Sequence, residues 1–212
     1  MGFELDLRPF LQTAIALIAI ANPFAAVPTF LSIIPSNDPN ATRQAAKRVA
    51  FAVLVILVGA VLIGRFVLDF FGISFAAFRV GGGLVVTLTG LDMLRRQHAT
   101  PLEDATAESL ADQLVVPMAM PLIAGPGTII TAMTMAARSR SAGPPWMVLV
   151  AVAVVAGVVW LVLTMSGWLQ AHLGARGQAI VMRFMGLVLV AVGAQLVLAG
   201  VGDFYGLAGA GS

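Results

Sequence analysis

Cysteine is absent from this chain of 212 residues, and charge is scarce, since only 10% of the residues are Asp, Glu, Lys or Arg. The lack of cysteine excludes disulfides, thiolate metal sites and cysteine nucleophiles. A soluble domain carries about 25% charged residues, so this chain has too few to cover a surface that faces water. The 12 Lys and Arg residues stand singly or in pairs, without the basic stripe typical of nucleic-acid binding. We therefore expect no nucleic-acid partner.

Long apolar runs fill most of the chain, which is 59% hydrophobic with a mean hydropathy of +0.98. About 20 consecutive apolar residues form a helix that spans a hydrocarbon core of roughly 30 Å. Runs of this kind fall at 9–34, 49–70, 73–94, 114–137, 146–170 and 179–201. The sequence therefore predicts an all-α integral membrane protein with six transmembrane helices, whose first partner is the lipid bilayer.

The distribution of positive charge predicts the orientation. Six spans place both termini on the same side of the membrane. Seven of the 12 Lys and Arg residues lie in or beside the first, third and fifth connections. Because positive charge favours cytoplasmic loops, we expect the termini on the periplasmic or extracellular side.

An internal repeat divides the chain into two halves at an offset of 103 residues. Ile20-Ala21-Asn22-Pro23 recurs as Ile123-Ala124-Gly125-Pro126, and Gly83 and Gly90 recur as Gly186 and Gly193. Three spans per half is an odd number, so the second half must cross the membrane in the opposite sense, as in many secondary transporters. We predict a first three-helix repeat over 1–95, a polar linker over 96–112, a second repeat over 113–203 and a short tail over 204–212. A duplication kept only for packing is the alternative.

Proline and glycine interrupt spans one and four, in Asn22 to Pro28 and in Pro117 to Thr128. Proline lacks an N–H and clashes with the carbonyl one turn back, so a helix kinks or breaks there. Broken backbone at membrane depth is tolerated only where protein or a water-filled cavity surrounds it, and a helix N-terminus can hold a carboxylate. Ordinary proline kinks, which are common in membrane helices, are the alternative. The predicted substrate-binding residues are Asn22, Pro23, Pro28, Thr29, Gly125, Pro126, Gly127 and Thr128.

Arg79 and Arg183 lie near the start of the last span in each half. An arginine within the bilayer is costly enough to indicate a function, so we consider a gating role for both. The alternative is that each side chain reaches the membrane interface. Arg65 and Asp69 are four residues apart and are expected to pair on one helix face.

Enzymatic motifs are missing, including His-Glu-x-x-His and a Gly-x-Ser-x-Gly elbow. We expect no catalysis, no metal site and no cofactor. The small, neutral residues beside the breaks favour a small substrate without net positive charge. A passive channel and a translocator of another small solute or lipid-linked substrate are the alternatives to a transporter.

The segments IANPFAAVPTF and, about 100 residues later, PMAMPLIAGPGTI resemble the MarC family, also called the small neutral amino acid transporter family. This family is grouped with the LysE-type exporters, and the resemblance covers nearly the whole chain. It implies a multi-pass protein of the bacterial inner membrane that moves small neutral amino acids such as glycine or alanine, with export as the expected direction. The sequence leaves open the coupling ion and whether a homo-oligomer forms.

Overall fold

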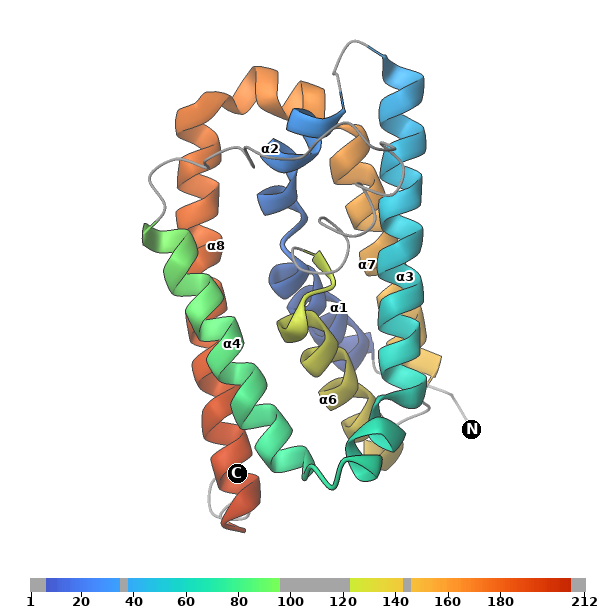
Figure 1. Ribbon diagram of the computed structural model, residues 1–212, viewed down its shortest axis with the longest axis vertical. Coiled ribbons are helices and arrows are strands. Elements are labelled where there is room, and N and C mark those ends of the chain that lie inside the picture. Colours follow the sequence, from blue (N-terminus) through green and yellow to red (C-terminus); the bar gives the residue numbers. More distant parts are fainter. Residues whose placement is uncertain (1–6, 35–37, 96–122, 143–145, 207–212) are drawn as a thin grey trace.

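The computed structural model describes residues 7–34, 38–95, 123–142 and 146–206, which are almost entirely helical (Figure 1). The helices, labelled as in Figure 1, are α1 (Leu7–Ala21), α2 (Pro23–Ile33), α3 (Pro39–Phe70), α4 (Phe75–Arg95), α6 (Pro126–Ala142), α7 (Trp146–Thr164) and α8 (Ser166–Phe204).

Five segments within the described ranges are long and apolar enough to cross a membrane: Thr13–Leu31, Pro39–Phe70, Phe75–Arg95, Trp146–Thr164 and Arg176–Phe204. The prediction of an all-α integral membrane protein is confirmed. The predicted span 114–137 begins outside the described residues, and α6 covers its second part. The predicted linker 96–112 lies outside the described residues.

Two antiparallel helix pairs flank the centre of the bundle. α4 packs along α8 on the left of Figure 1, and α3 packs along α7 on the right. The broken helix α1–α2 and the helix α6 lie between the two pairs. α1 begins in the lower half of the view, and α8 ends at the lower end.

The long helix α3 has well-defined ends. Asp38 caps its start, where the side chain accepts hydrogen bonds from the N–H groups of Asn40 at 2.8 Å and Ala41 at 3.2 Å. The helix stops before Gly72, whose φ of +67° is a left-handed conformation that favours glycine. Near this end Arg65 and Asp69 pair at 3.6 Å, as the spacing predicted, although both side chains are two-thirds exposed.

The fifth span is shorter than its apolar run of 146–170. α7 ends at Thr164, and residues 166–173 form the first part of α8, which lies across the upper end of the bundle in Figure 1. Gly174, with φ 57° and ψ 179°, then turns the chain into the last crossing. Hydropathy alone did not separate these parts because Trp168 and Leu169 continue the apolar run.

The outside of the helices is apolar. Phe66 and Leu198 are each more than 70% exposed, and many other large apolar side chains are exposed around the bundle. Apolar surface this extensive would face water at great cost, so it faces lipid. The interior core is formed by α1, α2, α3, α6 and α7.

Glycines bring α4 and α8 into backbone contact. A Cβ atom added to Gly83 would lie 2.7 Å from the carbonyl oxygen of Gly193, and one added to Gly90 would lie 2.6 Å from that of Gly186. These distances are shorter than real Cβ contacts. Only glycine permits this approach, which is the use that small residues commonly have between membrane helices.

Candidate functional site

The first helix breaks at Asn22. This residue has φ 39° and ψ 63°, a left-handed conformation that asparagine tolerates better than most residues. Its N–H donates to the carbonyl of Ile18 at 3.0 Å, which ends α1, and Pro23 begins α2. Proline is well suited to this first position because its missing N–H would have no helical partner.

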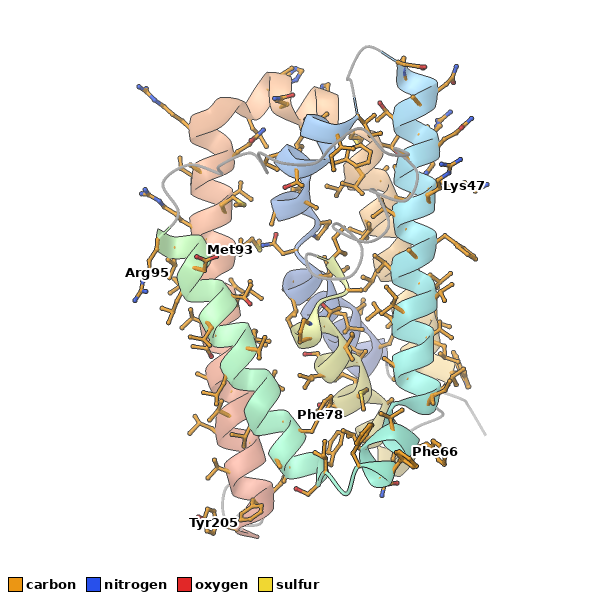
Figure 2. All side chains as sticks on the ribbon, viewed as in Figure 1. Lys47, Phe66, Phe78, Met93, Arg95 and Tyr205 are labelled. Atoms are coloured by element: carbon orange, nitrogen blue, oxygen red, sulfur yellow. The ribbon has the colours of Figure 1, made fainter. Side chains whose placement is uncertain are left out.

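The Asn22 side chain is almost fully buried, with 4% of its surface exposed. Its Nδ2 lies 3.7 Å from the sulfur of Met93, which Figure 2 shows pointing from α4 toward the centre of the bundle. Its Oδ1 has no hydrogen-bond partner among the described residues. A buried amide oxygen left in this state costs about 1–3 kcal/mol, and a bound ligand with a donor group would remove that cost.

The second break lies one repeat further on. Pro126 begins α6, and the N–H of Ile129 donates to the carbonyl of Gly125 at 3.1 Å. Thr128 is buried, and its hydroxyl donates to the carbonyl of Ile123 at 2.8 Å. The Thr128 side chain therefore satisfies one of the backbone carbonyls at this break.

The two breaks lie close together. A Cβ atom added to Gly127 would lie 3.4 Å from Cγ2 of Ile20 and would clash with Val86 of α4. From this point α2 runs to the upper end of the bundle and α6 to the lower end (Figure 1). The N-termini of both helices, which carry partial positive charge, therefore face the centre from opposite directions.

Two further polar groups on α6 were not predicted from the sequence. Thr131 and Thr134 are each 2% exposed, and their hydroxyls have no hydrogen-bond partner among the described residues. They follow Thr128 at intervals of three residues, and this spacing of threonines within an apolar run was the available signal. Together with Asn22 they make the buried centre more polar than hydropathy indicates.

The structure brings together most of the predicted substrate-binding residues. Asn22 and Pro23 lie at one break, and Gly125, Pro126, Gly127 and Thr128 at the other, where only Pro126 is exposed. Pro28 and Thr29 are partly buried and lie further along α2, about 8–9 Å from the break at 1.5 Å per residue.

The two arginines predicted as a pair differ in their surroundings. Arg79 on α4 is 5% exposed, and its guanidinium pairs with the carboxylate of Asp203 at the end of α8, while its Nε has no partner among the described groups. Arg183 on α8 is exposed. The repeat therefore gives the two arginines equivalent positions but not equivalent contacts.

Metal ligands do not gather anywhere in the part of the chain that the structure describes. No group of three or more His, Asp or Glu side chains forms there, and the buried polar side chains in these ranges include no carboxylate. The centre offers hydrogen-bonding groups and helix ends rather than charged side chains.

The sequence has many relatives among membrane proteins. It is 32% identical over 200 residues to a UPF0056 membrane protein of Methanocaldococcus jannaschii, and this alignment covers 93% of this chain and 98% of the relative. It is also 32% identical over 201 residues to the UPF0056 inner membrane protein MarC of Salmonella typhimurium, and this alignment covers 88% of this chain and 91% of the relative. No solved structure matches it. Residues 7–205 match the family described as MarC family integral membrane protein. With nine-tenths of its length matched, this chain belongs to the MarC family.

Proposed function

We propose that this chain is a transporter, not an enzyme, and moves small neutral amino acids such as glycine and alanine across the inner membrane. The observation that carries the proposal is the meeting of two helix N-termini at the buried centre, where α2 begins at Pro23 and α6 at Pro126. Export as the direction rests on the resemblance to LysE-type exporters alone. The location follows that of the Salmonella relative, which is named an inner membrane protein.

The electrostatics of the centre suit a zwitterion. The N-termini of α2 and α6 each favour negative charge, by up to about 2 kcal/mol where they are partly buried. A substrate carboxylate fits between them, as at the discontinuous helices of other transporters. The C-terminal end of α1 and the free Oδ1 of Asn22 lie at the same break and favour the ammonium group.

The lining limits the substrate to a small molecule. Ala26, Ala124, Gly125 and Gly127 are buried beside the breaks, and none of them carries a large side chain. A substrate with net positive charge would need a buried carboxylate to offset its desolvation. The buried polar groups of the described residues provide none.

The reciprocal glycine contacts support a mechanism in which two inverted halves move against each other. The repeat offset of 103 residues matches Gly83 with Gly186 and Gly90 with Gly193. The contact between Gly83 and Gly193 therefore corresponds to the contact between Gly186 and Gly90, and both contacts exist. Such an exchange is expected of a two-fold relation between halves, with the axis passing midway along α4 and α8. A site on this axis can be opened to either side in turn.

Uptake of radiolabelled alanine and glycine into proteoliposomes tests the proposal. We expect saturable uptake that small neutral amino acids inhibit. Asn22→Gly removes the amide while keeping a residue suited to the left-handed conformation, and it should raise the concentration for half-maximal uptake about tenfold. Gly81→Leu, at an exposed α4 position with open space around it, is the matched control and should transport normally.

Three results would count against this function. Uptake that rises without saturation would indicate a passive channel. Absence of uptake in every imposed ion gradient, by protein shown to be folded, would refute the assignment of amino acids as the substrate. Equal uptake by the parent and the Asn22→Gly variant would show that the substrate site does not include the α1–α2 break.

A further inference from the structure

A groove lies on the outside of the bundle between the N-terminal half of α3 and the C-terminal half of α7, and none of the residues that line it belongs to the two breaks. Its volume is about 980 Å³, and it opens toward the surroundings of the protein. Its lining changes along its length from basic to apolar. This gradient is the feature that identifies a ligand.

The upper end of the groove is basic. Arg43, Lys47 and Arg48 line it, and all three side chains are exposed. Figure 2 shows Lys47 pointing outward from α3. The two ion pairs formed within the described residues involve other arginines, so these three cations have no carboxylate partner in those ranges. They are available to an anion.

The lower part of the groove is apolar. Phe51 and Leu54 of α3 form one side, and Ala153 and Gly157 of α7 lie opposite them. The small α7 residues leave a channel between the two helices, and a Cβ atom added to Gly157 would meet nothing within 4 Å. Trp160 of α7 also lines the groove, and tryptophan is enriched at membrane interfaces.

The length of α3 places this gradient at the membrane surface. Its 32 residues extend about 48 Å at 1.5 Å per residue, whereas the hydrocarbon core is roughly 30 Å thick. The first turns of α3, which carry the cations, therefore reach the level of the phospholipid headgroups. Phe51 and Leu54 follow at the level of the acyl chains.

A second, more polar cavity adjoins the basic end. Its volume is about 380 Å³, and it shares Asn40 and Arg43 with the groove. Thr164, whose hydroxyl has no hydrogen-bond partner among the described residues, and Trp168 also line it. A hydroxyl-bearing headgroup would find donors and acceptors there.

We infer that the groove between α3 and α7 is a binding site for an anionic phospholipid such as phosphatidylglycerol. Arg43, Lys47 and Arg48 hold the phosphate, the polar cavity takes the glycerol headgroup, and one acyl chain lies along Gly157 and Leu54. Basic pockets between membrane helices bind anionic lipid headgroups by this charge complementarity. The site is independent of the transport proposal, because it shares no residue with the two breaks.

Quenching of Trp160 fluorescence by brominated lipids tests the inference. Trp146→Phe and Trp168→Phe together leave Trp160 as the only tryptophan among the three that the chain contains. In vesicles we expect brominated phosphatidylglycerol to bind beside Trp160 roughly tenfold more strongly than brominated phosphatidylcholine, given three nearby cations. In the variant R43Q/K47Q/R48Q this preference should fall to about one.

Matched variants separate the site from general effects of charge and helix surface. Gly157→Leu fills the channel and should reduce quenching by the anionic lipid, whereas Gly81→Leu, on an exposed face of α4, should not. Replacing Arg65, Arg176 and Arg183 by Gln removes three exposed cations elsewhere and should leave the preference unchanged.

Three outcomes would overturn the inference. Equal quenching by the two lipids in the parent would indicate ordinary boundary lipid. A preference that survives in R43Q/K47Q/R48Q would place the anion elsewhere. Absence of quenching by both lipids would mean that protein, from a second copy or from another segment of this chain, fills the groove.

Discussion

The contact between α4 and α8 allows a quantitative test of the packing. In Gly90→Ala the new methyl group would lie 2.6 Å from the carbonyl oxygen of Gly186 and 2.8 Å from the backbone nitrogen of Val190. Ordinary contacts begin at 3.4 Å. The two backbones must therefore separate by about 0.8 Å, and backbone atoms cannot change rotamer to avoid this.

The expected cost follows from two opposing terms. Overpacking of a close interface typically costs about 1–3 kcal/mol, and a gap of 0.5–1 Å along the rest of the interface loses a quarter to a half of its dispersion energy. Alanine in place of glycine stabilises a helix by about 1 kcal/mol. We therefore expect Gly90→Ala to lower the free energy of unfolding by up to about 2 kcal/mol.

Gly81→Ala is the matched control because it makes the same chemical change on α4 in open space. It should be neutral or stabilising, so the difference between the two variants isolates the contact. Equilibrium unfolding in mixed detergent micelles, followed by circular dichroism, measures both. The double variant Gly90→Ala/Gly186→Ala should cost less than the two single changes together, because the helices separate only once. Equal stability of Gly90→Ala and Gly81→Ala would refute the backbone contact.

Three other predictions concern the site, the buried arginine and the orientation. Gly127→Ala should slow alanine uptake about tenfold because the new methyl group would clash with Val86. Adding Val86→Ala should restore uptake. A defect that persists in the double variant would show that the clash with Val86 is not the cause. Asp203→Asn leaves the buried guanidinium of Arg79 without its charged partner. This change should lower the free energy of unfolding by about 1–3 kcal/mol. Asp69→Asn, at the exposed pair with Arg65, should change it by less than about 0.5 kcal/mol. In this cysteine-free chain, Ser74→Cys between α3 and α4 should react with an impermeant maleimide added to intact cells, and reaction only after lysis would reverse the orientation.

The apolar runs and the prolines determined the main features of the fold. Hydropathy identifies a span because each residue contributes independently to the transfer into lipid. Proline at 23 and 126 begins a helix because its ring and missing N–H act on the local backbone, whatever surrounds it. The membrane class, five spans within the described residues and the helix starts at Pro23 and Pro126 were therefore predictable from the sequence, whereas the end of the fifth span at Thr164 was not.

The tertiary structure decided which groups meet. Arg79 and Asp203 are 124 residues apart, and the contact between them depends on the rotation of α4 and α8 about their axes, which hydropathy does not fix. The same rotation leaves Arg183 exposed although the repeat matches it to Arg79. Thr131 and Thr134 are buried because α6 lies between two helix pairs, and the groove with Arg43 and Trp160 exists because α3 and α7 pack side by side. Local patterns determine where a helix forms and breaks, whereas the faces that helices turn toward one another depend on the packing of the whole bundle.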